Sequence, residues 1–237
     1  MSFTSKLMQA YFNYAYNPVY DFTTARLSRY HTLQKRCVGK LDLEDNDKVL
    51  CVGLGTGNEV FHILETNKNV DIVGIDYSHI ALQKAYKKAL GLGKEIKCLI
   101  MDARFLEFTA GSFDKVLCIH VMDFAEENEK VTHEIVRVLR NSGRFAITYP
   151  STGEGLRLAI DLFKDSLHHN SSLFKLFLRL TAIFIGGGIV YFPLFLLGNR
   201  RGYSSSQLEA MFAGLKLEEF YIEADTVYQD FIVYGSK

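Results

Sequence analysis

Short apolar runs bounded by glycine and turn residues alternate with amphipathic segments as far as residue 150. Each run has the length and the residue content of a buried strand. The predicted strands are residues 48–53, 70–78, 95–103, 112–122 and 144–150. The predicted helices between them are residues 57–65, 78–93 and 124–140. Strands that alternate with helices in this way indicate a parallel sheet with right-handed crossovers.

The two ends of the chain depart from this alternation. Residues 4–38 are predicted to be helical with a break at Asn17-Pro18, because proline pushes the residue before it out of helical space. Near the other end, a helix at 204–214 precedes strands at 215–224 and 226–235, whose short link requires them to pair antiparallel. We therefore expect an α/β fold with a doubly wound, mostly parallel seven-stranded sheet and an antiparallel C-terminal hairpin.

We expect one domain over residues 1–237, built from parts of different character. Residues 1–40 form an N-terminal helical cap, and residues 41–150 and 204–237 form the core that carries the sheet. Residues 151–203, which follow the fifth predicted strand, form a helical and strongly apolar insertion.

Composition excludes some partners. The 237 residues include 27 basic and 27 acidic side chains, so no charged field is available to attract a polyanion, and we expect no nucleic-acid partner. The four cysteines are scattered and none forms a Cys-x-x-Cys pair, which is typical of reduced thiols in a cytoplasmic protein. The first residues lack the apolar core and cleavage site of a secretory signal.

The strongest chemical signal is a glycine-rich turn between the first predicted strand and the helix after it. Gly53, Gly55 and Gly57 alternate there with Leu54 and Thr56. Glycines at such a turn let a ligand approach the main chain closely. Asp76 ends the next strand, and an acid at that place suits the two hydroxyls of a ribose. The pattern predicts a nucleoside-binding loop.

These blocks resemble the class I S-adenosylmethionine-dependent methyltransferases. GLGTGN with VGIDYS, IMDARFLEFTAGSFDKVLCIHVM and VLRNSGRFAIT are similar to that family's successive motifs. The resemblance implies a Rossmann-like fold and S-adenosyl-L-methionine as the cofactor. The entry segment with Tyr20-Asp21 is similar to the ubiquinone and menaquinone C-methyltransferases, which makes them the nearest subfamily.

The resemblance also implies roles for individual residues. Around the cofactor it places Tyr20, Gly53, Gly55, Gly57, Asp76, Tyr77, Asp102, Ala103, His120 and Val121. The glycines face the methionine part, Asp76 holds the ribose, and Asp102 reaches the adenine. The family often has an aspartate where this chain has Cys51, which leaves the cofactor ammonium to backbone carbonyls or to another acid.

Candidate catalytic residues follow from the predicted rim of the sheet. His120 lies just past the fourth strand, where ligands of such folds bind, and is the first candidate for a base or polariser. A structural role beside the cofactor is the alternative for this histidine. Asp123 and Tyr149 are second candidates, and His31 is a third. The pair His168-His169 has no further ligand at a suitable spacing, so no metal is expected.

The insertion contains the run IFIGGGIVYFPLFLL at residues 183–197, which is long enough to suggest a membrane span. A single crossing would separate two parts of one sheet, and three glycines and a proline interrupt the run. We expect a hydrophobic lid over the substrate, with two alternatives left open: a homodimer interface or extra core, and a patch in peripheral contact with a membrane.

Together these features predict methyl transfer to a small lipophilic or aromatic acceptor, by in-line displacement, in a cytoplasmic or membrane-associated protein. Positioning carries most of such a reaction, with general-base help where the acceptor must lose a proton. The alternative is a non-catalytic protein of the same fold that uses the apolar insertion as an interface for binding or assembly.

Overall fold

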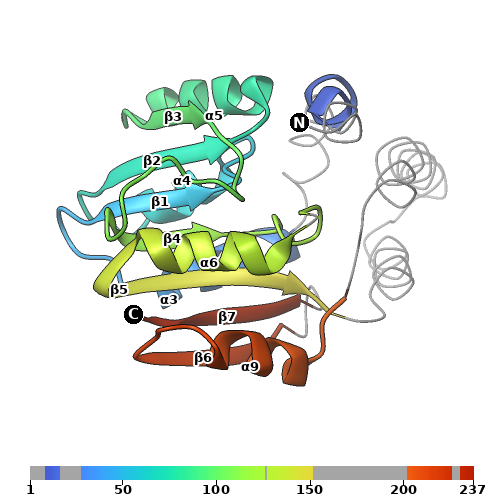
Figure 1. Cartoon of the computed structure of the whole chain (residues 1–237). Helices are drawn as coiled ribbons and strands as arrows, with labels where there is room; N and C mark the ends of the chain where they lie inside the picture. Colours follow the sequence, from blue (N-terminus) through green and yellow to red (C-terminus); the bar gives the residue numbers. More distant parts are fainter. Residues whose placement is uncertain (1–8, 17–27, 126, 152–201, 226–229) are drawn as a thin grey trace, which may run out of the picture.

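The computed structural model describes residues 9–16, 28–125, 127–151, 202–225 and 230–237. Within them a 7-stranded sheet runs through the molecule, with α6 and α9 in front of it and α3 and α4 behind it in Figure 1. The predicted doubly wound α/β fold is confirmed.

Seven strands form the sheet in the order β3-β2-β1-β4-β5-β7-β6. They are β1 Lys48–Val52, β2 Asp71–Asp76, β3 Lys97–Ile100, β4 Phe113–Cys118, β5 Leu139–Pro150, β6 Glu219–Ala224 and β7 Asp230–Ser236. β1 to β5 pair parallel, and β7 pairs antiparallel with both β5 and β6. The predicted five parallel strands and C-terminal hairpin are therefore both present.

The described helical segments differ from the predicted ones mainly in length. They are η1 Phe12–Tyr16, α3 Ser28–Lys40, α4 Asn58–Leu64, α5 His79–Gly91, α6 Asn128–Val138 and α9 Ser205–Ala213. The Ser78 hydroxyl accepts a hydrogen bond from the Ala81 amide at 3.2 Å, which caps the start of α5. Ser204 and Gln207 form a capping box at the start of α9.

β5 begins earlier than the sequence indicates. Residues 141–143 were predicted to be a turn before a strand at 144, but the strand already starts at Leu139. Ser142 has a φ of 61°, and the pairing register with β4 shifts between Phe113 and Lys115. The turn chemistry is thus absorbed as an irregularity within a longer strand.

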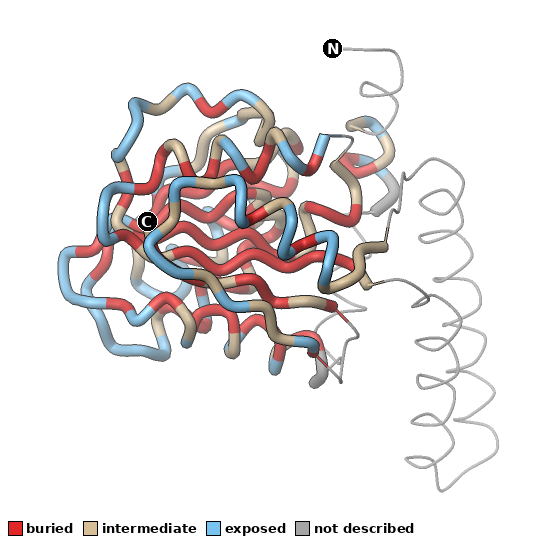
Figure 2. Tube along the Cα trace, turned by 60° about the horizontal axis from the view of Figure 1, so that its bottom comes forward, coloured by how far each residue is buried: buried red, intermediate tan, exposed pale blue. Residues whose placement is uncertain are grey.

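Two apolar clusters cover the two faces of the sheet, and the inner strands are buried along most of their length, unlike the edge strands β3 and β6 (Figure 2). β1 shows this most clearly, because Val49 to Val52 are all buried. Such strands have apolar residues in succession rather than in alternation. The strand order reverses at β1, so a crevice opens at the carboxyl ends of β1 and β4.

Among the described residues, no helix combines the length and the apolar character needed to cross a bilayer. The run at 183–197 and most of the predicted lid at 151–203 lie outside the described residues. The lid, its alternatives and the domain division stay predictions.

Candidate functional site

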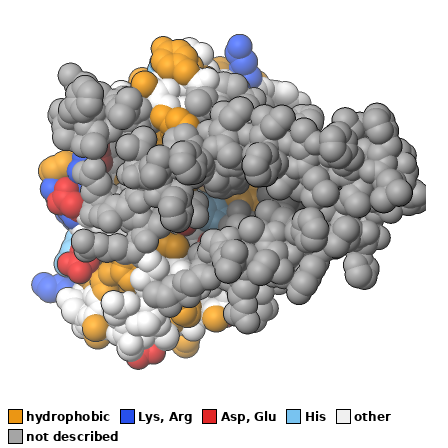
Figure 3. All heavy atoms as spheres, turned by 90° about the vertical axis from the view of Figure 1, so that its right-hand side faces the viewer, with side chains coloured by type: hydrophobic (Ala, Val, Ile, Leu, Met, Phe, Trp, Pro, Cys, Tyr) orange, Lys and Arg blue, Asp and Glu red, His pale blue; other side chains and the backbone are white. Residues whose placement is uncertain are grey.

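A cavity of about 420 Å³ lies at the carboxyl ends of the parallel strands. Its wall combines the loop after β1, the ends of β2, β3 and β4, and side chains from η1, α3 and α4. Figure 3 views the molecule from the side to which these strands point, and hydrophobic and histidine side chains are visible on that side. The cavity therefore opens at the crevice that the strand order creates.

The loop after β1 is held in a conformation that glycine favours. Gly53, Gly55 and Gly57 have φ values of 68°, 54° and 77°. A Cβ on Gly53 would come within 2.1 Å of the Val121 side chain, and a Cβ on Gly57 within 2.8 Å of Ala85. At Gly55 the nearest atom would be 3.9 Å away. The outer glycines thus permit close packing, while the middle one leaves main chain open beside the cavity.

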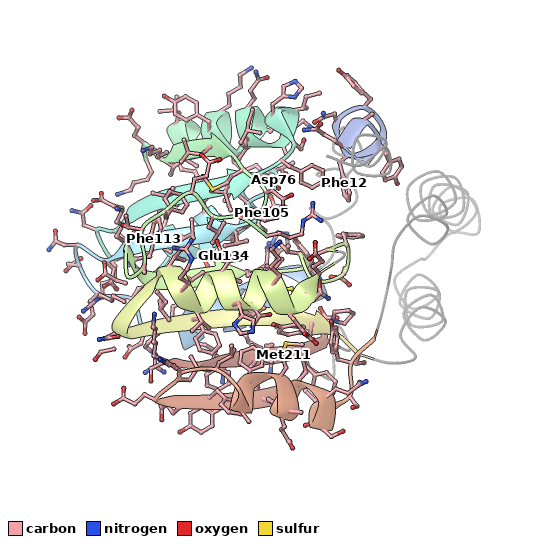
Figure 4. The ribbon with its side chains drawn as sticks, in the orientation of Figure 1. Phe12, Asp76, Phe105, Phe113, Glu134 and Met211 are labelled. Carbon is pink, nitrogen blue, oxygen red and sulfur yellow. The ribbon has the colours of Figure 1, made fainter. Side chains whose placement is uncertain are left out.

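Asp76 fixes the same loop from the end of β2. Its carboxylate accepts the Gly55 amide at 2.9 Å and the Ser78 amide at 2.8 Å. Burial raises the pKa of the Asp76 carboxyl, although these two hydrogen bonds act in the opposite direction. Figure 4 shows Asp76 and Phe12, from β2 and η1, near one another at this edge. Asp76 can therefore orient the loop and still present an oxygen to hydroxyl groups of a ligand.

Asp102 and Ala103 line the cavity beyond the end of β3. The Asp102 carboxylate accepts hydrogen bonds from the Arg104 guanidinium, at 2.7 Å for Nη2 and 3.1 Å for Nε. Burial opposes ionisation of Asp102, but the bonds from Arg104 outweigh it, so the pKa of this carboxyl is lowered. Asp102 is thus an ionised acceptor at the β3 end of the cavity.

His120 stands at the β4 end of the cavity with a φ of 58°. Its Nδ1 lies 3.2 Å from carboxylate oxygens of both Asp123 and Asp230. Its ring stacks on Tyr30, with centroids 5.4 Å apart and planes inclined by 15°. Its amide donates to the Thr148 hydroxyl at 2.8 Å. Main chain and imidazole are therefore both held in place.

The two carboxylates at Nδ1 favour the tautomer that carries its proton on Nδ1, which makes Nε2 the basic nitrogen of the neutral ring. His120, Asp123 and Asp230 also offer one ligand atom each within 4.8 Å of one another. Among the described residues this is the cluster where a cation could bind, and the sequence prediction of no metal did not consider it.

The structure does not place all the predicted residues at the cavity. Tyr77 and Val121 line it, and Asp123 adjoins it through His120. Tyr149 is fully buried and its hydroxyl lies 2.6 Å from that of Thr132, so it belongs to the core rather than to the cavity wall. Tyr20 lies outside the described residues.

Several cavity residues were not found from the sequence. Gln34 on α3 and Glu59 on α4 line the cavity and are 0% and 7% exposed. Phe12 and Tyr30 contribute aromatic wall, and Asp230 is brought to His120 from β7. Glu59 follows the last glycine by two residues and could have been noticed as an acid next to the loop; the others carry no local signal.

Comparison with known proteins agrees with this geometry. The sequence profile of a family described as "Methyltransferase domain" matches residues 43–184. A phosphatidylethanolamine N-methyltransferase of Cereibacter sphaeroides is 33% identical over 131 residues, covering 54% of this chain and 62% of the relative. A demethylmenaquinone methyltransferase of Thermus thermophilus is 33% identical over 133 residues, covering 55% and 60%.

The fold has solved counterparts as well. An S-adenosylmethionine-dependent methyltransferase from Aquifex aeolicus superposes with a TM-score of 0.55 at 15% identity, covering 85% of this chain and 88% of the other. At this identity the likeness concerns the fold. The chain spans about 60% of the length of the two relatives it matches above.

The described residues fit S-adenosylmethionine as the cofactor. A ribose needs an acceptor for its hydroxyls, and Asp76 offers one beside the open main chain at Gly55. The adenine and the amino acid part need polar groups at opposite ends of the cavity. Asp102 stands at the β3 end. Gln34 stands on α3, which packs on β5 and β7, and Glu59 stands on α4, which packs on α3.

Proposed function

The chain belongs to the methyltransferase domain family, and we propose on that basis that it transfers a methyl group from S-adenosylmethionine to a small lipophilic or aromatic acceptor. The observation that carries the proposal is the cavity at the switch point of the sheet. It joins the glycine loop and Asp76 to a histidine framed by aromatic side chains.

The cofactor supplies a methyl group on a sulfonium, which an electron-rich acceptor atom can displace in line. The protein has to bind and orient both molecules and to keep water out. In the proposal Asp76 binds the ribose hydroxyls, and the open main chain at Gly55 faces the ligand. Asp102 and Ala103 hold the adenine. Tyr77 and Val121 pack beside the bound cofactor.

His120 accepts a proton from the acceptor in this proposal, where the acceptor must lose one. Asp123 forms the hydrogen bond to Nδ1, and the Asp230 carboxylate lies 3.2 Å from the same atom, which leaves Nε2 as the basic atom; Tyr30 fixes the plane of the ring. Asp123 and Asp230 are positioning residues, because they act through His120.

A lipophilic acceptor is supported by the walls of the cavity and by the insertion. Phe12, Tyr30 and Phe124 are aromatic wall residues on the side of His120. The run at 183–197 adds a large apolar segment to the same chain. Two relatives bear the names of lipid substrates, phosphatidylethanolamine and demethylmenaquinone. Membrane contact and a homodimer remain predictions for this insertion.

The opposing function is non-catalytic binding, for which the absence of an acid at Cys51 is the supporting observation. A methyl-transfer assay decides between them and tests the acceptor class. Methyl-labelled S-adenosylmethionine is offered with phosphatidylethanolamine vesicles, a demethylmenaquinol, or soluble phosphoethanolamine. We expect label in a lipophilic acceptor and little in the soluble head group. Equal transfer to the soluble compound would contradict the acceptor class, and absence of any transfer would favour the binding function.

A second experiment addresses the insertion. Replacing residues 183–197 by a polar linker of equal length should abolish turnover and leave the affinity for the cofactor product nearly unchanged. Loss of cofactor binding in this variant would mean that the segment belongs to the core and not to the acceptor side.

A further inference from the structure

Two buried polar side chains of the cavity have no part in the function proposed above. Glu59, on α4, is 7% exposed, and Gln34, on α3, is 0% exposed. Both line the cavity, and α3 packs against α4. Burying a carboxyl and an amide together costs free energy unless each finds a partner.

Gln34 shows this cost most clearly. Neither its amide nitrogen nor its amide oxygen has a hydrogen-bond partner among the described residues. Most buried side-chain polar atoms in proteins are satisfied, and an exception calls for a reason such as a missing ligand. An amide nitrogen is a donor that suits a carboxylate.

Glu59 lies in the first turn of α4, which begins directly after the glycine loop. Burial is the main reason why the pKa values of the Cys51 and Cys118 thiols are raised, and the Glu59 carboxylate is the next contributor in both cases. Glu59 also lines the same cavity as His120, which follows β4. Cys51 itself is 1% exposed and supplies no charge to a ligand.

Within the described part of the chain, no cation forms an ion pair with Glu59. Lys88 on α5 acts on it electrostatically, but its ammonium donates to the Asn58 side chain at 2.6 Å. Asp76 on β2 is a further negative neighbour. A carboxylate in this place is therefore suited to a small cation delivered by a ligand.

We infer that Glu59 and Gln34 form the subsite for the α-amino acid end of the cofactor, with Glu59 accepting from the α-ammonium and Gln34 donating to the α-carboxylate. Glu59 then stands in, from α4, for the acid that is absent at Cys51 on β1. The inference rests on the proposed function, because it presumes the same cofactor.

The order of the strands supports this orientation. β3, β2, β1 and β4 are consecutive neighbours in the sheet. Asp102 marks the β3 end of the cavity, Asp76 the β2 end, and Glu59 the start of α4, after the loop that follows β1. An extended cofactor that has its adenine at Asp102 and its ribose at Asp76 reaches Glu59 with its amino acid end.

Two ligands separate the subsite from the rest of the cavity. S-adenosylhomocysteine has the amino acid end, whereas 5′-methylthioadenosine lacks it and keeps the adenine and ribose. Calorimetry on the full chain should show that Glu59→Gln weakens the binding of S-adenosylhomocysteine at least about tenfold, as expected for the loss of a charge-assisted hydrogen bond. Methylthioadenosine should bind with unchanged affinity.

Three further variants complete the design. Gln34→Leu should also weaken the binding of S-adenosylhomocysteine and leave that of methylthioadenosine unchanged. It should raise the thermal midpoint of the cofactor-free protein, because an unsatisfied amide is removed. Asp76→Ala should weaken the binding of both ligands. Glu95→Gln, the same change as at Glu59 but at an exposed position outside the cavity wall, should affect neither.

The results distinguish a failure of the inference about Glu59 from a failure of the proposed function. Equal weakening of both ligands by Glu59→Gln would mean that Glu59 shapes the loop, and it would overturn the inference while leaving the cofactor site intact. Unchanged binding of both ligands would overturn it as well. If the unmodified protein does not bind S-adenosylhomocysteine, the proposed function itself fails.

Discussion

Replacing Glu59 by glutamine should stabilise the cofactor-free protein, and more so as the pH rises. Burial raises the pKa of the Glu59 carboxyl from 4.5 to about 8, with Asp76 adding to the effect and Lys88 opposing it. Between these two pH values the folded protein keeps a proton that the unfolded chain has released. Stability therefore falls as the pH increases through this window, and it levels off above it.

The size of the effect follows from proton linkage. Each pH unit inside the window lowers the free energy of unfolding by about 1.4 kcal/mol, which gives an upper limit of about 5 kcal/mol between pH 4.5 and pH 8. Glutamine has nearly the same shape and cannot ionise. The difference in free energy of unfolding between the variant and the unmodified protein should therefore grow with pH and then become constant.

Urea denaturation of both proteins at several values between pH 5 and pH 8 measures this difference. Histidines and other carboxyls are common to the two proteins, so their titration cancels. Glu95→Gln serves as the matched control and should give a difference that does not depend on pH. A pH-independent difference for Glu59→Gln as well would refute the reasoning, because it would show that Glu59 is already ionised in the folded protein.

Three other predictions concern the site. Binding of S-adenosylhomocysteine at pH 7 should release up to about one proton, because the ammonium drives Glu59 to ionise; calorimetry in two buffers measures this, and equal heats would contradict it. His120→Gln should lower kcat by about 10²-fold or more, with a smaller loss for Asp230→Asn. Unchanged kcat in His120→Gln would exclude it as the base. Tyr149→Phe should keep full turnover while losing about 1 kcal/mol of stability in urea denaturation, since its hydroxyl bonds Thr132 in the core; a large loss of kcat would disprove that placement.

The cofactor side of the site could be predicted because its signals are local. Gly53, Gly55 and Gly57 follow one strand directly, and Asp76 ends the next. Parallel neighbours in a doubly wound sheet bring such ends together without any knowledge of distant contacts. The same local logic applied to the parallel pairing of the first five strands and to the antiparallel ending.

Residues that depend on distant pairing could not be predicted. Asp230 reaches His120 because β7 pairs antiparallel with β5 in the register that sets Asp230 opposite Pro150. That register depends on packing across the sheet and leaves no mark in the local sequence. Gln34 likewise enters the cavity through the packing of α3 on α4, β5 and β7.

Tyr149 shows why position along a strand is insufficient. It lies near the end of β5, as the sequence indicated, but neighbouring side chains on a strand point to opposite faces. The Thr148 hydroxyl accepts from the His120 amide, whereas the Tyr149 ring packs against Phe212 on the other side. The face of β5 on which a side chain lies therefore determines whether it contacts the site.

Calorimetric titration of the full chain with S-adenosylhomocysteine, compared with the Asp76→Ala variant, tests the central claim most directly. The claim is that the cavity beside the glycine loop binds the methyltransferase cofactor through Asp76. The account predicts one bound molecule per chain and an affinity at least about tenfold weaker in the variant, as for the loss of charge-assisted hydrogen bonds. Absence of binding, or equal affinity of the two proteins, would contradict it.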